Sequence, residues 1–139
     1  MEILEKVAAW LESFPLWDGE KLTIDSIGPA PGSLGLFPMG VEEISRREDV
    51  LGNVAVRCAC VFTLRRSACP GEDNARWLLD LQNWVMEQDR LGLAPKFGDD
   101  PKTERIRAYE GKLDRSFQTG SGLYTLQLRA EFTKIYEVK

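Results

Sequence analysis

The sequence predicts an α+β domain of two layers, in which a mostly antiparallel sheet of about four to five strands packs two helices on one face. The chain has 139 residues, of which 43% are hydrophobic and 29% are charged, and this suits one globular domain spanning residues 1–139. Two segments carry apolar residues at helical spacing, and several others alternate apolar and polar residues as strands do. The strands are joined by hairpin-like connections, which favour a fold with the sheet in one layer and the helices in a second layer.

The first helix is expected over residues 2–13, because apolar residues recur on one side and Pro15 ends the segment. Residues 22–27 alternate apolar and polar side chains and predict a strand. In residues 28–40, seven of thirteen residues are Gly or Pro, which argues against a helix and against a central strand. Four large apolar residues nevertheless lie in this segment: Leu34, Leu36, Phe37 and Met39. We therefore expect a loop that packs either on its own domain or on a neighbouring subunit.

Residues 41–49 alternate charged and apolar side chains and predict an exposed or edge strand. The dipeptide Gly52-Asn53 predicts a turn that joins it to residues 54–65 as an antiparallel hairpin. This second run is the strongest strand, with one apolar face formed by Val54, Val56, Cys58, Cys60, Phe62 and Leu64.

The second helix is expected over residues 74–90, with Trp77 and Trp84 packed in the core and Gly92 after its end. Residues 93–103 are irregular, residues 105–110 predict a short strand, and residues 111–121 predict a turn or loop that includes Phe117. Residues 123–138 predict a long final strand, whose apolar face carries Tyr124, Leu126, Leu128, Ala130, Phe132, Tyr136 and Val138.

The chain contains no histidine, which excludes mechanisms that need an imidazole base and removes most zinc, haem and non-haem iron sites. The three cysteines, Cys58, Cys60 and Cys69, lack the paired spacing of a metal site and have no helper base. We expect Cys58 and Cys60 to be structural core thiols, and Cys69 to lie in a turn before Pro70-Gly71. No other residue pattern supplies a catalytic set. We therefore expect a protein that is not an enzyme and has no catalytic residue, no cofactor and no metal.

The net charge is −4, so the whole chain has no basic footprint for direct readout of nucleic acid. The charge is uneven: residues 1–45 contain two basic and eight acidic residues, whereas residues 46–139 contain 16 basic and 14 acidic ones. This division of charge suits head-to-tail association of subunits. The alternative is that it reflects ordinary variation of surface charge. The first residues indicate an amphipathic helix rather than a signal peptide, and no apolar run approaches the ~20 residues that cross a membrane. We expect a cytoplasmic protein with no membrane partner.

The order of elements resembles the tail terminator (minor capsid-like) proteins of long-tailed phages and prophages. The resemblance begins with an N-terminal helix followed by the strand Leu22-Thr23-Ile24-Asp25. The other residues that carry it are Pro31-Gly32-Ser33, Leu36-Phe37-Pro38, Phe62–Ala68, Asn74, Leu81, Trp84, Gly122–Leu128 and Tyr136. Residues 69–73 depart from the usual pattern, which puts the local loop geometry in doubt.

The resemblance implies a structural subunit that forms a ring, a hexamer in this family, at the end of the tail tube. Its expected partners are further copies of itself, the tail tube protein and a head-completion or connector protein. It would assemble in the host cytoplasm and then lie at the head–tail junction of the virion. By analogy the contacts map onto Leu34, Leu36, Phe37, Met39, Glu43, Arg46 and Arg47.

Two other functions stay open at this point. One is a small host adaptor that adds a partner strand to an exposed sheet edge. The other is a ligand-binding domain without catalytic activity, which needs a concave pocket with convergent polar groups. Its candidate residues, Asp25, Arg57 and Tyr124, are scattered along the chain.

Overall fold

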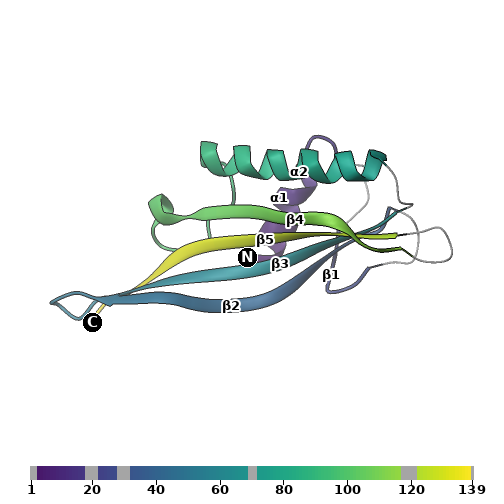
Figure 1. Ribbon diagram of the computed structural model, residues 1–139. Helices are drawn as coiled ribbons and strands as arrows, with labels where there is room; N and C mark the ends of the chain where they lie inside the picture. The colour runs from purple at the N-terminus through teal and green to yellow at the C-terminus, as the bar shows by residue number, and fades with distance from the viewer. Residues whose placement is uncertain (1–2, 18–21, 28–31, 69–71, 117–121, 139) are drawn as a thin grey trace.

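The computed structural model describes residues 3–17, 22–27, 32–68, 72–116 and 122–138 (Figure 1). The elements in chain order are α1 (Ile3–Glu12), β1 (Thr23–Ile24), β2 (Leu34–Glu48), β3 (Val54–Ala68), α2 (Glu72–Leu91), a 3-10 turn η1 (Pro101–Thr103), β4 (Arg105–Ser116) and β5 (Gly122–Tyr136). The five strands form one sheet in the order β1-β2-β3-β5-β4. All pairings are antiparallel except the short parallel one between β1 and β2. The α+β fold class is confirmed.

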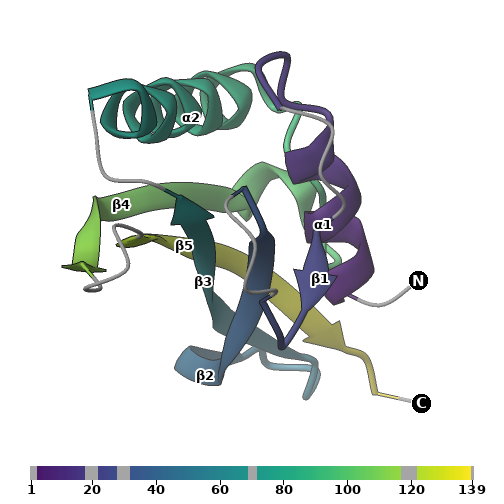
Figure 2. The same ribbon diagram turned by 90° about the vertical axis from the view of Figure 1, so that its right-hand side faces the viewer.

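The helices and one face of the sheet share a single hydrophobic core. Figure 2 shows the sheet curving so that α2 lies over β4 while α1 lies beside β1. Leu11 of α1, Leu81 of α2 and Leu126 of β5 are fully buried where these elements meet. The alternation predicted for residues 54–65 and 123–138 places Cys60, Phe62 and Leu64, and the apolar residues from Tyr124 to Phe132, on this core, as expected from a period of two residues. The prediction is wrong for Tyr136 and Val138, which are each 60% exposed.

An aromatic cluster joins the two helices. The indole rings of Trp10 and Trp84 stack with their centroids 5.0 Å apart, and Phe14 lies 5.4 Å from Trp84. Trp10 also donates its Nε1–H to the side-chain oxygen of Gln88 across the helix pair, at 3.0 Å. Trp77 packs against Phe14 at 5.9 Å. The packing role predicted for both helix tryptophans is thus confirmed, and these contacts fix how α1 crosses α2.

The loop predicted for residues 28–40 is wrong for residues 34–40, which form the first half of β2. The strand tolerates Pro38 because the regular pairing with β3 is interrupted between Pro38 and Val41 by a bulge. Gly40 lies in this bulge with φ of 107°, a left-handed conformation that glycine adopts without steric cost. Residues 28–31 lie outside the described part of the chain.

Two other boundaries differ from those predicted. β1 has only two residues, because Asp25 leaves the strand with a left-handed φ of 58°. β4 continues to Ser116, although a turn was expected from residue 111. The strand passes this point through a bulge at Glu110 and Gly111, where a Cβ on Gly111 would lie only 2.6 Å from the side-chain oxygen of Gln82 on α2. A Cβ at this position would displace the flexible amide of Gln82, which shows how closely β4 passes α2. Phe117 lies beyond the described residues.

Candidate assembly surface

A long hairpin formed by β2 and β3 extends past the body of the molecule (Figure 1). We term residues 38–53 of this hairpin the arm. The eleven residues from Pro38 to Glu48 are all exposed, although β2 is continuous through them. Large apolar side chains among them face solvent, since Met39 is 61% and Val41 62% exposed. An exposed strand with apolar side chains is a surface that ordinarily requires a partner.

The tip of the arm is a turn that presents two further apolar side chains. Val50 is fully exposed and Leu51 is 75% exposed. The Asp49 carboxylate holds the turn by accepting the backbone N–H groups of Leu51 and Asn53, at 2.9 and 3.0 Å, and the side-chain amide of Asn53 at 3.0 Å. Asn53 in turn accepts the backbone N–H of Val138, at 2.9 Å, so that the turn is tied to the chain beyond β5. The tip therefore presents its apolar residues from an ordered turn.

The contribution of Asp49 to the stability of the protein depends on pH. The side-chain hydrogen bond from Asn53, followed by the backbone hydrogen bonds, holds the pKa of this carboxyl below its ordinary value. A lowered folded-state pKa stabilises the protein above the pKa of the unfolded chain, and this stabilisation is lost as the pH falls through the folded-state pKa. We expect Asp49→Asn to be slightly less stable than wild type at neutral pH, with a difference that vanishes in acid. Urea denaturation as a function of pH measures this, and a difference independent of pH would contradict it.

The structure separates the seven residues that the resemblance placed at the interface. Leu34 and Leu36 are 1% and 0% exposed, so their assignment to a contact surface is wrong. They point into the core because β2 pairs with β3 in a register that sets Leu36 beside the buried Leu64. Phe37 lies on the opposite face, half-buried, with its ring 4.5 Å from the guanidinium carbon of Arg65. The remaining four residues are exposed on the arm: Met39, Glu43, Arg46 and Arg47.

The arm contains further exposed apolar residues that the sequence reasoning did not select. Val41 and Ile44 belong to the strand, and Val50 and Leu51 form its tip. The signal was present in the sequence, because an apolar pair directly before Gly52 is unusual for a solvated turn. Arg46 and Glu43 form an exposed ion pair at 2.6 Å, which contributes little to stability and leaves the apolar side chains as the main feature of the arm.

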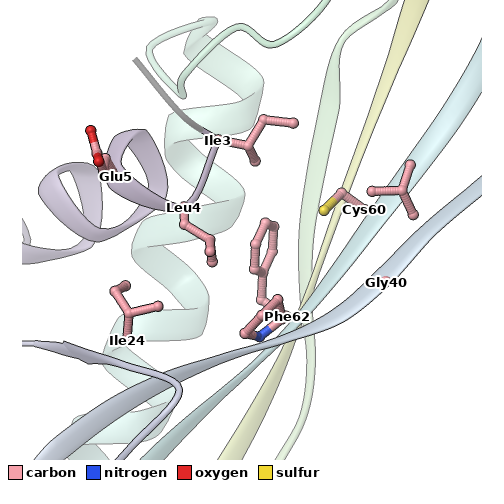
Figure 3. A pocket seen from close by; sticks show the side chains of 9 residues that line it. Ile3, Leu4, Glu5, Ile24, Gly40, Cys60 and Phe62 are labelled. Carbon is pink, nitrogen blue, oxygen red and sulfur yellow. The ribbon is translucent and has the colours of Figure 1, made fainter.

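An apolar cavity of about 380 Å³ opens at the base of the arm. It is lined by Ile3, Leu4, Glu5, Ile24, Pro38, Gly40, Val41, Cys60 and Phe62. Figure 3 shows Leu4 and Phe62 directed into the same space, with the carboxylate of Glu5 turned away. Burial raises the pKa of the Cys60 thiol, which keeps it protonated and poorly nucleophilic. The cavity is suited to an apolar group rather than to a polar metabolite.

The residues considered for a ligand site do not converge. Tyr124 is buried on the helix-facing side of β5, Arg57 lies on the opposite face of the sheet, and Asp25 is exposed beside β1. Cys60 is buried and Cys58 packs partly against the core, in line with the structural role predicted for them, while Cys69 falls outside the described residues.

Within the described ranges, no three His, Cys, Asp or Glu side chains gather closely enough to hold a metal ion. Among the helices that are described, neither combines the length and the apolar character needed to cross a membrane. Comparison of the chain with models of protein families gives no match, and comparison with curated proteins gives none either. The functional inference therefore depends on the residues and surfaces described above.

Proposed function

We propose that this protein is a structural assembly subunit, a ring-forming tail terminator of the kind that its sequence resembles, which ends a tail tube and joins tail to head. The observation that carries the proposal is the arm. Its eleven exposed strand residues and its apolar tip have no covering element among the described residues. A protein that works by contact between subunits needs such a surface.

The free margins of the sheet support the same proposal. β1 pairs with β2 only at Gly35 and Leu36, so the outer edge of β2 along the arm has no strand beside it within the described chain. β4 forms the opposite margin of the sheet, where the Asp89 carboxylate of α2 already accepts the backbone N–H of Ile106 and no further strand lies beside β4 within the described chain. Unpaired edges of this length are templates for strand pairing with another chain.

The directions of the strands allow the two margins to meet. β2 is antiparallel to β3, β3 to β5 and β5 to β4, so β2 and β4 run in opposite directions. When one copy is placed beside the next in the same orientation, β2 of the first and β4 of the second would pair as antiparallel strands. This contact joins two different surfaces, and such contacts close into rings when the rotation between copies is suitable.

Light scattering after size-exclusion chromatography tests the proposal, with purified tail tube protein present and absent. We expect the wild-type chain to associate with itself or with the tube protein. A V41D/I44D variant of the arm should lose this association. The matched control is L79D/M86D, which introduces two aspartates at exposed apolar positions of α2.

The control should fold and associate as wild type does. A wild-type chain that remains monomeric and never binds tube subunits would refute the proposal. Equal loss of association in both variants would show that added negative charge prevents association wherever it is placed. The arm would then not be the contact surface.

The cavity at the base of the arm favours one second candidate, a domain that binds a small apolar ligand. A thermal-shift screen with apolar compounds tests it. Stabilisation of the wild-type chain that disappears when Leu4 is replaced by aspartate would support this function over the first. No shift with any compound would leave the assembly role as the better explanation of the surface.

A further inference from the structure

The face of the sheet that points away from the helices, termed here the open face, concentrates positive charge. The strand register assigns seven basic side chains to it among the described residues: Arg47, Arg57, Arg65, Arg105, Arg107, Lys112 and Arg129. The same register assigns it two acidic side chains, Glu42 and Glu131. The chain as a whole has a net charge of −4, so the charge is separated between the open face and the rest of the molecule.

The acidic side chains near this face balance only part of its positive charge: Glu42 and Glu131 lie on it, and Asp49, Asp100 and Glu137 line hollows that Arg47 also lines. The Glu131 carboxylate lies 3.4 Å from Arg57, 3.2 Å from Arg129 and 3.7 Å from Arg107. One carboxylate cannot neutralise three guanidinium groups. Arg129 also contacts Glu42 at 3.1 Å, and its hydrogen bond to Glu131 holds the pKa of Arg129 above its ordinary value. Arg107 and Arg129 stand directly opposite each other on β4 and β5, and within this pair the single Glu131 carboxylate offsets the repulsion between the two guanidinium groups.

Two hollows on the open face are lined by pairs of arginines. A hollow of about 450 Å³ lies beside Arg107 and Arg129 and is completed by Ala108 and Tyr109. A second, of about 250 Å³, is lined by Ser45, Arg47, Ala55, Arg57, Asp100, Thr103 and Thr133. Asp100 is the one acidic member of that lining, and its carboxylate caps the backbone N–H of Lys102. Guanidinium and hydroxyl donors around a hollow are suited to phosphate oxygens.

We propose that the open face binds the phosphate backbone of a nucleic acid duplex, without reading its bases. The basic residues are spread over four strands, from the level of Arg47 to that of Arg65 and Lys112. On β3 this corresponds to ten residues, or about 33 Å. One turn of a duplex spans about 34 Å and carries roughly one charge per 1.7 Å, so an extended polyanion matches the patch better than a single phosphate does.

A second copy of this chain fits the patch less well. The acidic side chains on the outer face of α2 are partly neutralised by arginines of the same helix, since Arg76 lies 3.9 Å from Asp73 and Arg90 pairs with Glu87. α2 therefore offers no continuous acidic surface opposite the open face. Duplex binding goes beyond the proposed assembly function and does not depend on it, because the patch belongs to one subunit.

Fluorescence anisotropy with two labelled 30-base-pair DNA duplexes of unrelated sequence tests the proposal, at salt concentrations from about 50 to 200 mM. The wild-type chain should bind both duplexes equally, and the affinity should fall steeply with salt. R107Q/K112Q removes two exposed charges from the open face. Its affinity at low salt should be at least about tenfold weaker, and the slope of log affinity against log salt should decrease by about two.

The matched control is R76Q/R90Q, which removes two positive charges from α2 and should bind as wild type does. Absence of binding by the wild type at low salt, equal losses in both variants, or a clear preference for one duplex would each overturn the proposal. So would a loss of self-association in R107Q/K112Q with unchanged DNA binding, which would identify a second copy as the occupant. Light scattering on the same samples separates failure of the assembly proposal from failure of this one.

Discussion

Replacement of Leu36 by aspartate is expected to abolish cooperative folding. Leu36 is 0% exposed and stands beside Leu64, which in turn stands beside Leu126, so the three side chains form one buried row across β2, β3 and β5. A carboxylate in this row would lose its hydration and gain no partner. The cost should exceed about 4 kcal/mol, a large fraction of the roughly 5–15 kcal/mol that stabilises a typical domain. Circular dichroism during urea and thermal denaturation measures the loss.

The neighbouring residue provides the matched control. Phe37 points to the open face, is half-buried and lies against Arg65. An aspartate at position 37 would face the Arg65 guanidinium, so F37D should stay folded and lose no more than about 2 kcal/mol. Equal damage by L36D and F37D would show that the two residues do not lie on opposite faces of β2. We also expect F37D to impair association more than folding, because a half-buried aromatic side chain suits a contact surface, and light scattering measures this loss.

The strands β3 and β5 could be predicted because their pattern is strict. Alternate residues are apolar over residues 54–64 in β3 and over residues 124–132 in β5, and no competing helical period fits. The first half of β2 could not be predicted in this way. Its Gly and Pro content argues locally against a strand, but pairing with β3 decides the outcome and confines Pro38 and Gly40 to a bulge. Local propensity gave way here to tertiary pairing.

The sequence predicts that the candidate surface contains apolar residues, but it does not predict which of them are exposed. Leu36 and Met39 are equivalent as apolar residues in a sequence, yet the first is buried and the second is 61% exposed. Their positions along β2 distinguish them, because Leu36 lies where the strand crosses the core, whereas every residue from Pro38 to Glu48 is exposed on the arm. The charge pattern has the same limit. Dividing the chain at residue 45 suggests an acidic and a near-neutral part, whereas the register gathers cations from β2, β3, β4 and β5 onto one face.

Truncation of Phe62 to alanine is expected to destabilise the protein by about 3–5 kcal/mol. Phe62 is 1% exposed, and it lines the apolar cavity at the base of the arm together with Leu4. Removing the ring deletes buried apolar surface and enlarges a cavity that is already present. The surrounding side chains can therefore fill only a small part of the enlarged cavity. The midpoint of urea denaturation should fall with an unchanged dependence on urea.

The control for Phe62 is the adjacent residue on the other face of β3. Val61 is only partly buried and stands opposite Arg129, so V61A should cost less than about 1 kcal/mol. The enlarged cavity of F62A also predicts recovery of part of the lost stability by benzene, since dry apolar cavities of sufficient size bind it. If F62A and V61A cost the same and benzene stabilises neither, then Phe62 does not hold the base of the arm to the core. Together the two variants test whether Phe62, which contacts both the cavity at the base of the arm and the hydrophobic core, attaches the arm to the core.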